Sequence, residues 1–497
     1  MNVAGLLERS AAYFPERTAL VFKDRRWTYR ELDREVSALA SGLKRLDLTA
    51  GERIGLHLPN WPEFVFSYYA AQKIGLIPLS LNVTYKADEL AYLCRDGEVS
   101  AVVTADPVAG NLPARAVVPS LRHLIWVGSN PRDSVNFAEV RGDAALRAME
   151  LDRDETAAIL YTSATTGHPK GVMLSHSNLV SNVYATMHHL RMAAEDRGLC
   201  ALPLFHVFGQ NFIMNALVGS GGTLVLQERF VLEEFLEAVG RERITLLYAV
   251  PTMYILFLSA DLSRYALASL RLCFSAAAIL PIEVEQRWQE RTGYRIHQGY
   301  GLTECSPFAS YNHEILHRPG SVGTPVENVE MRVVDEEGAE VPDGDRGEIL
   351  IKGPNVMKGY FRNPEATAHA VRNGWLHSGD VGYRDADGYY YVVDRLKDMI
   401  NVSGFKVFPR EVEEILFLHP AVREAAVVGT PDPVRGEAVK AFVVLREAVQ
   451  IAPDALIAFC RDRIASYKVP EAVEFVPALP KSPSGKVLKK ALRREHS

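Results

Sequence analysis

Residues 161–171 read Tyr-Thr-Ser-Ala-Thr-Thr-Gly-His-Pro-Lys-Gly, a stretch rich in hydroxyl groups and glycine that ends beside a lysine. The apolar run 157–160 before it predicts a buried strand, and residues 177–190 after it predict a helix. Hydroxyls and backbone N–H groups can surround phosphate oxygens, glycine permits close approach, and lysine supplies charge. The spacing of a Walker loop is absent, and the competing interpretation is a polar surface loop. We expect a polyphosphate-binding turn between a strand and a helix, made by Thr162, Ser163, Thr165, Thr166, Gly167 and Lys170.

The first half of the chain alternates short apolar runs with helical patterns. Thr28 and Glu31 form a capping box before a helical stripe, residues 54–58 predict a strand, and residues 62–74 predict the next helix. This alternation is typical of parallel α/β layers. From about residue 327, β-branched runs separated by Gly and Asp turns predict an antiparallel β region.

Composition narrows the class of protein. The 497 residues are 48% hydrophobic and 23% charged, as in ordinary globular proteins, and the net charge of −6 gives no reason to expect nucleic acid as a partner. Five scattered cysteines without a C-x-x-C pair argue against a disulfide framework or a zinc site. The N-terminus lacks a secretory pattern, and no apolar run approaches the ~20 residues of a membrane helix. We therefore expect a cytoplasmic protein without an integral membrane segment.

Residues 161–171, called the opening stretch below, resemble the phosphate loop of the adenylate-forming superfamily. That superfamily contains acyl-CoA synthetases, peptide-synthetase adenylation domains and beetle luciferases. The family usually has Gly where this chain has Ala164, which stiffens one loop position but removes no donor. Further matching segments cover nearly the whole chain. The resemblance implies a large N-terminal α/β assembly with a β subdomain, residues 1–396, which binds ATP and the acyl substrate. It also implies a small mobile C-terminal α+β lid domain, residues 397–497, with the catalytic lysine and access for CoA.

Residues 298–304, Gln-Gly-Tyr-Gly-Leu-Thr-Glu, resemble the family's nucleotide motif. The resemblance implies that Tyr300 stacks on adenine, Thr303 contacts the α-phosphate and Glu304 holds Mg²⁺. A hard carboxylate suits a hard cation that bridges phosphates. Small residues are expected around the nucleotide in this motif and in the adenine-side loop at 274–278, namely Gly299, Gly301, Ala276, Ala277 and Ala278.

The remaining motifs imply the ribose site and the moving parts. Asp380 and Arg395 match the family's ribose-binding pair, and Lys397 stands at its hinge position. Gly404 occupies the place where the pantetheine arm passes close to the backbone. Lys486, in the segment 480–486, matches the catalytic lysine of the mobile loop. The basic residues after it are expected to form a solvated face, with contact to CoA phosphate as the lesser alternative: Lys489, Lys490, Arg493 and Arg494.

His206, in the segment 204–209, resembles the family residue that borders the carboxylate pocket, although a histidine beside aromatic residues can also be a packed core residue. Amino-acid-activating relatives have an Asp in this segment as the counter-ion of the substrate ammonium. Residues 205–212 contain none, and a buried unpaired ammonium is costly. Amino acids are therefore not expected as substrates.

The resemblance implies a two-step ligase. A carboxylate and ATP, with Mg²⁺, would give acyl-adenylate and pyrophosphate, and the thiol of CoA would then give acyl-CoA and AMP. The alternatives are loading of an acyl carrier protein, an oxygenase of the luciferase type and an inactive binding protein. A group of apolar residues predicts that the substrate is an apolar acid. Both aryl acids and fatty acids fit, and we favour a medium- or long-chain fatty acid here. The residues are Phe205, Phe208, Phe212, Val250 and Ala276–Ala278. We expect a monomer or a homodimer.

Overall fold

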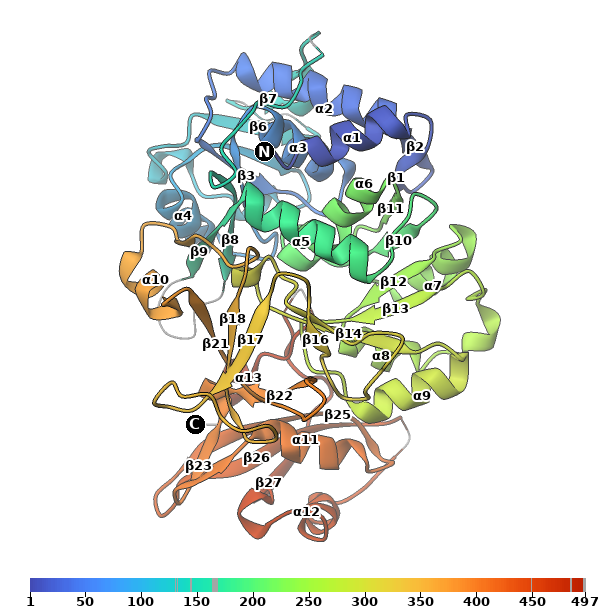
Figure 1. The fold of residues 1–497 in the computed structure, drawn as a ribbon, viewed down its shortest axis with the longest axis vertical. Helices are drawn as coiled ribbons and strands as arrows, with labels where there is room; N and C mark the ends of the chain where they lie inside the picture. Colours follow the sequence, from blue (N-terminus) through green and yellow to red (C-terminus); the bar gives the residue numbers. More distant parts are fainter. Residues whose placement is uncertain are drawn as a thin grey trace.

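A computed structural model describes residues 1–129, 131, 133–143, 145–162, 169–447, 449–482 and 485–494. The described residues form four β-sheets flanked by helices. Three sheets belong to a large N-terminal part, and the fourth belongs to a small C-terminal domain at the bottom of Figure 1. This arrangement confirms the expected large α/β assembly with a β subdomain and a smaller C-terminal domain.

The first sheet has the strand order β16-β15-β14-β13-β12-β10-β11-β1-β2. Its strands are β1 (Thr18–Phe22), β2 (Arg25–Thr28), β10 (Arg197–Cys200), β11 (Thr223–Leu226), β12 (Leu246–Ala249), β13 (Leu272–Ser275), β14 (Ile296–Tyr300), β15 (Ser310–Tyr311) and β16 (Thr324–Pro325). The six central strands pair in parallel: β1, β11, β10, β12, β13 and β14. Strands β2, β15 and β16 pair antiparallel at the two edges of the sheet. The fully buried strands β11, β12 and β13 explain the continuous apolar runs in the sequence.

The second sheet has the order β19-β9-β8-β4-β3-β5-β6-β7. Its strands are β3 (Arg53–His57), β4 (Ile77–Ser80), β5 (Val99–Ala105), β6 (His123–Val127), β7 (Val135–Asn136), β8 (Thr156–Thr162), β9 (Lys170–Ser175) and β19 (Gly359–Tyr360). Strand β9 corrects one expectation, because it follows the opening stretch before any helix begins. It pairs antiparallel with β8, so the stretch connects two strands of a hairpin instead of a strand and a helix.

Helices cover the two large sheets. They are α1 (Gly5–Tyr13), α2 (Tyr29–Lys44), α3 (Pro62–Lys73), α4 (Ala87–Asp96), α5 (His176–His189), α6 (Ala216–Ser220), α7 (Leu232–Arg241), α8 (Pro251–Phe257), α9 (Ile282–Thr292) and α10 (Pro364–Ala370). The Thr28 capping box opens α2 as predicted, and a second box between Ser175 and Asn178 starts α5 directly after β9. Within the described chain, none of the helices is both long and apolar enough to cross a membrane.

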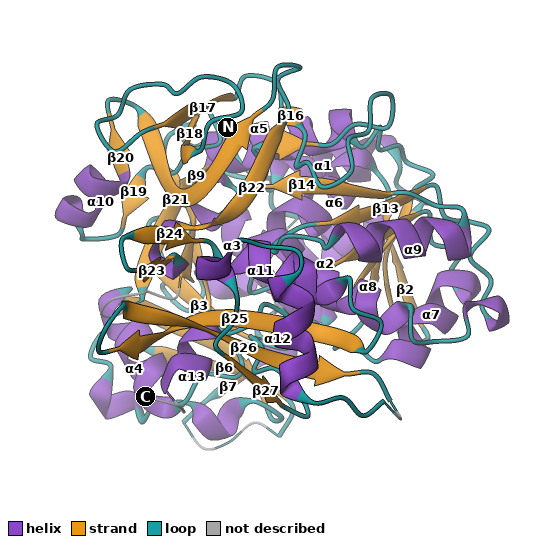
Figure 2. Ribbon diagram, turned by 90° about the horizontal axis from the view of Figure 1, so that it is seen from below, coloured by secondary structure: helices purple, strands orange, loops and turns teal. Residues whose placement is uncertain are grey.

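The two antiparallel sheets complete the fold. The β subdomain contains β17 (Glu330–Val334), β18 (Gly347–Lys352), β20 (Val371–Arg372), β21 (Trp375–Arg384) and β22 (Tyr390–Arg395). The C-terminal domain contains β23 (Ile400–Val402), β24 (Phe405–Val407), β25 (Val422–Asp432), β26 (Gly436–Leu445) and β27 (Ala472–Phe475), with α11 (Pro409–Phe417), α12 (Pro453–Arg461) and α13 (Lys489–Arg494). Seen from below, β25 and β26 cross in front of the N-terminal elements (Figure 2). A cluster of buried side chains around Val412 and Val443 gives this domain its own hydrophobic core.

Candidate active site

The opening stretch connects the end of strand β8 to the start of strand β9, and these two strand ends are paired. Thr162 ends β8 and stands opposite Lys170, the first residue of β9. The Lys170 ammonium lies 5.0 Å from the centre of the Tyr360 ring, a cation–π distance. The other predicted phosphate-loop residues lie outside the described residues: Ser163, Thr165, Thr166 and Gly167.

Glu304 lies in the short 3₁₀ helix Thr303–Cys305, directly after strand β14. Its Oε1 accepts a hydrogen bond of 2.9 Å from the hydroxyl of Tyr360 on β19, and burial raises the pKa of the Glu304 carboxyl. Among the described residues, no group of three His, Cys, Asp or Glu side chains is arranged to hold a metal. A single carboxylate fits Mg²⁺, which usually keeps water and phosphate oxygens among its ligands and takes only one or two carboxylates from the protein.

Sheet register brings the expected ribose pair together. Asp380 on β21 and Arg395 on β22 are direct partners across the two strands, and Arg395 Nε lies 3.4 Å from Asp380 Oδ1. The hydroxyl of Tyr300 donates to Asp380 Oδ2 at 2.8 Å. An aromatic ring, a carboxylate and a guanidinium are thus joined in one polar cluster. Such a cluster offers acceptors and donors for ribose hydroxyls beside a face suited to a base.

Small residues leave room beside this cluster. Ala277, with a left-handed φ of 71°, and Ala278 line a cavity of about 680 Å³ together with Gly299 and Gly301. Ala276 is not among the lining residues, and both Ala276 and Ala277 pack against the core. A Cβ on Gly301 would lie 1.6 Å from the carbonyl oxygen of Pro307, so only glycine fits there. Strand β13 ends at Ser275 and strand β14 at Tyr300, next to these small residues.

Lys486 enters the same cavity from the C-terminal domain. Other residues on the cavity wall are Tyr300, Asp380, Arg395 and Lys397. Burial, with the positive charge of Arg395, lowers the pKa of Lys486 to about 8. The Thr252 hydroxyl donates to the carbonyl of Gly485 at 3.3 Å, which ties the lysine's segment to the N-terminal part.

His206 belongs to the N-terminal part and lies near Lys486 of the C-terminal domain. Burial, with the charge of Lys486, lowers the pKa of the His206 imidazole to about 4, so the ring is neutral near pH 7. Its Nδ1 accepts a hydrogen bond of 3.2 Å from the backbone N–H of Phe208, which leaves Nε2 as the protonated nitrogen. His206 is therefore a neutral donor near a lysine. It is not among the residues that line the cavity described above, and its role at a carboxylate pocket stays a prediction.

Gly404 lies away from this cluster. It forms the exposed turn between β23 and β24 with a φ of 87°, and its N–H donates to Asn401 Oδ1 at 2.9 Å. It is not among the residues that line the cavity described above. Its role in thiol access stays a prediction.

Comparisons with known proteins agree with this geometry. The model of the AMP-binding enzyme family matches residues 7–361, and that of the AMP-binding enzyme C-terminal domain matches residues 411–486. The chain belongs to the AMP-binding enzyme family. It is an AMP-forming acid–CoA ligase, with a carboxylic acid, ATP and CoA as its substrates.

Three relatives of this AMP-binding enzyme illustrate the range of acids named for similar proteins. A long-chain-fatty-acid–CoA ligase of Bacillus subtilis (strain 168) is 37% identical, over 100% of this chain and 95% of the relative. A feruloyl-CoA synthase of an Amycolatopsis species is also 37% identical, over 98% and 97%. The crystal structure of the anthranilate CoA ligase AuaEII with anthranoyl-AMP has a TM-score of 0.94 at 32% identity, over 100% and 97%.

The structure of this AMP-binding enzyme corrects the expectation for the basic C-terminal residues. Lys489 is not on a solvated face, because its ammonium lies 2.9 Å from Glu413 Oε1 and 4.0 Å from Asp394 Oδ2. Burial opposes its charge, but these carboxylates outweigh burial and raise the pKa of Lys489. Arg493 likewise pairs with Asp398 at 3.3 Å.

Two groups at the site were not predicted. The Tyr360 hydroxyl reaches Glu304 from a position 56 residues further along the chain, and no local pattern predicts that contact. Glu413 lies on helix α11 and contacts Lys489 from the far end of the C-terminal domain's sequence. Its spacing from Lys489 carries no signal either, so both contacts required the fold.

Proposed function

We propose that this ligase activates an apolar monocarboxylic acid in one lid orientation and transfers the acyl group to CoA in another. The observation that carries the proposal is the position of Lys486, a C-terminal residue, in one cavity with Tyr300, Asp380 and Arg395 of the N-terminal part. This geometry supports assigning the present orientation to adenylation.

In the first half-reaction, a carboxylate oxygen attacks the α-phosphorus of ATP, and pyrophosphate leaves with the electrons of the broken P–O bond. Lys486 would orient the carboxylate and the α-phosphate and offset the charge that grows at phosphorus. His206 would donate from Nε2 toward the acid, and Tyr300, Asp380 and Arg395 would hold the nucleoside. The α-phosphate contact of Thr303 remains a prediction from the motif.

Magnesium would be held by Glu304 together with phosphate oxygens of ATP. When bound, Mg²⁺ neutralises phosphate charge and orients the leaving pyrophosphate. The Tyr360 hydroxyl fixes one oxygen of Glu304, which aims the carboxylate. Glu304 would hold the cation through its carboxylate while the Tyr360 hydroxyl keeps that carboxylate in place.

In the second half-reaction, the sulfur of CoA attacks the acyl carbon and the thiol proton passes to water. AMP leaves with the electrons of the broken C–O bond. A domain boundary at residues 396/397 would let the lid turn about Lys397 and carry Lys486 away. Arg395 ends strand β22, so the proposed pivot lies directly beyond the rigid sheet. Gly404 would then come to the path of the thiol.

The acid remains the open part of the function. The long-chain-fatty-acid and feruloyl relatives, at the same 37% identity, support a fatty and an aryl acid equally. The lining residues Pro251, Ile255 and Ala278 support an apolar acid of either class.

The test is pyrophosphate–ATP exchange over a panel of acids, each followed by acyl-CoA analysis with and without CoA. We expect exchange that depends on the acid and on Mg²⁺, and thioester only when CoA is present. Absence of exchange with every acid would contradict the proposed activity. Exchange without acyl-CoA formation would contradict CoA as the acceptor.

A further inference from the structure

We propose that four packed phenylalanine rings restrict this enzyme to compact acids, namely acids with one aromatic ring or a short chain. The rings belong to Phe208, Phe212, Phe274 and Phe308, which we call the aromatic wall. This inference rests on the proposed function, and it departs from the medium- or long-chain acid expected from the sequence.

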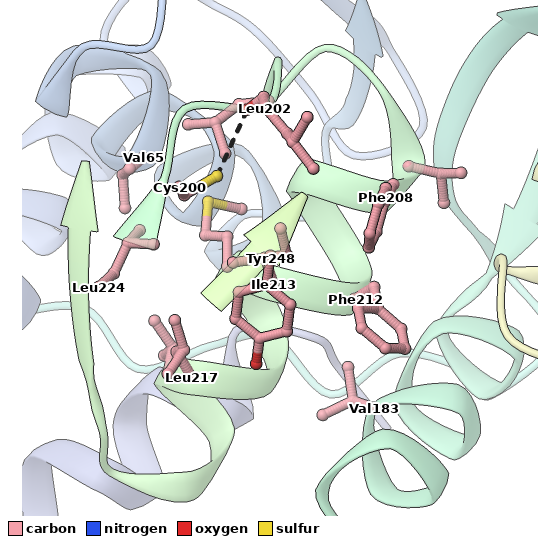
Figure 3. Packing of buried hydrophobic residues seen from close by; sticks show 14 of the residues in the cluster. Val65, Val183, Cys200, Leu202, Phe208, Phe212, Ile213, Leu217, Leu224 and Tyr248 are labelled. Carbon is pink, nitrogen blue, oxygen red and sulfur yellow. Dashed lines mark hydrogen bonds between the residues drawn. The ribbon is translucent and has the colours of Figure 1, made fainter. Parts of the chain in front are cut away.

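The aromatic wall begins beside the groups that would hold the reacting carboxylate. The N–H of Phe208 donates to His206 Nδ1, and His206 lies within electrostatic reach of Lys486. Phe208 also opens the π-helical segment Phe208–Asn215, in which Phe212 follows one turn later. Figure 3 shows both rings on the same side of that segment. An acyl group anchored at His206 and extended inward would therefore meet these rings.

The wall fills the space directly behind strand β14. Gly299 lines the cavity, and a Cβ built on it would lie 2.4 Å from Phe274 Cζ and 3.0 Å from Phe308 Cε2. The ring of Phe274 therefore packs directly against Gly299 and leaves no space there for an acyl chain to extend past the glycine. Phe274 has no exposed surface, so it belongs to the packed core and does not edge an open channel.

The rings hold one another in place. The centroid of Phe212 lies 4.5 Å from that of Phe274, 5.0 Å from that of Phe308 and 5.3 Å from that of Phe208. These are favourable aromatic distances inside a close-packed interior. Opening a tunnel for a long chain would require several buried rings to move together.

The cavity itself carries charged side chains that a long hydrocarbon would have to cover. Asp394, Arg410, Glu413 and Lys489 line it together with apolar residues such as Ile255 and Phe417. A long chain laid across them would remove charged groups from water without replacing the lost hydration. A flat ring or a short chain can instead be held in front of Gly299 without displacing the aromatic wall behind it.

The test compares kcat/KM for pyrophosphate exchange with benzoate, butyrate, dodecanoate and hexadecanoate. We expect the unaltered enzyme to favour benzoate or butyrate over both long acids by at least about tenfold, the scale on which apolar pockets discriminate. Phe274→Leu should shift the ratio of dodecanoate to benzoate upward by about tenfold. Phe212→Leu is a second route to the same result if the first variant unfolds.

Phe235→Leu is the matched control. Phe235 is another fully buried ring, stacked on Phe257 at 5.3 Å in helices α7 and α8. Its truncation should lower thermal stability in a similar way but leave the order of acids unchanged. A shift shared by all three variants would mean that general loosening, and not the aromatic wall, changes the preference.

A reciprocal variant tests the contact itself. Gly299→Ala should impair exchange with all acids because its methyl group collides with Phe274, and adding Phe274→Leu should restore exchange at least partly. Preference of the unaltered enzyme for dodecanoate, or unchanged acid order in both Phe274→Leu and Phe212→Leu, would overturn the proposal. Failure of every acid would instead refute the proposed activity on which it rests.

Discussion

Lys486 of the C-terminal domain lies close enough to His206 of the N-terminal part for its charge to add to burial in lowering the imidazole pKa to about 4. The two residues are 280 positions apart in the sequence, and the lid orientation brings them together. The same proximity makes the lysine available to a carboxylate held at His206. It is also a contact that rotation of the lid would abolish.

Lys486→Ala should separate the two half-reactions. Removing a cation positioned at a phosphoryl-type transition state should lower adenylation by roughly 10²–10³, measured by pyrophosphate exchange. With chemically made acyl-adenylate and CoA, the same variant should form thioester at close to the normal rate. Equal loss in both halves would show that Lys486 maintains structure and would remove the main support for a turning lid.

The pH dependence of kcat/KM should show the ionisation of Lys486. Because the pKa of Lys486 is lowered to about 8, the ammonium is charged at pH 7 and loses its proton as the pH rises through 8. The kcat/KM of the free enzyme for ATP should therefore decline above about pH 8 with a single ionisation. Lys486→Arg keeps its charge in this range, so any activity it retains should lack the decline. A decline of the same midpoint in that variant would assign the ionisation to another group.

Tyr360→Phe should raise the Mg²⁺ concentration needed for half-maximal exchange. The variant loses the hydrogen bond that aims Glu304, and a hydrogen bond to a charged group is worth about tenfold or more. Glu304→Gln should have the larger effect, since it removes the charge itself. Tyr389→Phe, which loses a hydrogen bond to the Leu316 carbonyl, is the control and should leave the magnesium titration unchanged.

Gly404→Leu should slow thioester formation and leave pyrophosphate exchange near normal. Its bulk would lie at the predicted thiol path, although the left-handed φ of 87° also disfavours leucine. Gly338→Leu is a matched control, because Gly338 has a φ of 86° and equal space around its Cβ in the β17–β18 connection. Acyl-CoA formation at the unaltered rate by the Gly404 variant would exclude this glycine from the path.

Lys489→Met should destabilise the enzyme by about 3 kcal/mol, because it leaves the Asp394 and Glu413 carboxylates buried without their cation. Thermal and urea unfolding measure this loss. Lys490→Met, which alters an exposed neighbour, should stay within about 0.5 kcal/mol of the unaltered chain. Similar losses in the two variants would contradict the burial argument.

The sequence predicted the features that local pattern determines. Alternating apolar runs and the Thr28 capping box predicted the α/β layers and the start of α2, and the structure confirms both. The Asp380–Arg395 pair followed from motif resemblance, and strand register supplies the physical reason that the two meet. Their roles toward ribose stay predictions.

Long-range contacts were beyond the same reasoning. Strand β9 was missed because residues 170–175 are too short and mixed to separate from the turn before them, and their pairing with β8 decides their structure. Lys489 was read as solvated because basic residues are usually exposed, whereas two carboxylates distant in sequence surround it. Phe208 and Phe212 were read as signs of an apolar acid, whereas their packing with Phe274 and Phe308 is visible only in the fold.

The end of strand β22 also sets a length scale for catalysis. Arg395 is held in register by Asp380, and Lys397 follows two residues later, so very little free chain separates the nucleotide clamp from the proposed pivot. An extended residue spans at most about 3.6 Å, and so short a tether would confine the proposed lid to an arc around the nucleotide site. A lid that turns there, as proposed above, would therefore work at a high effective concentration. Lengthening the tether would dilute Lys486 at the reacting phosphate without altering any contacting side chain.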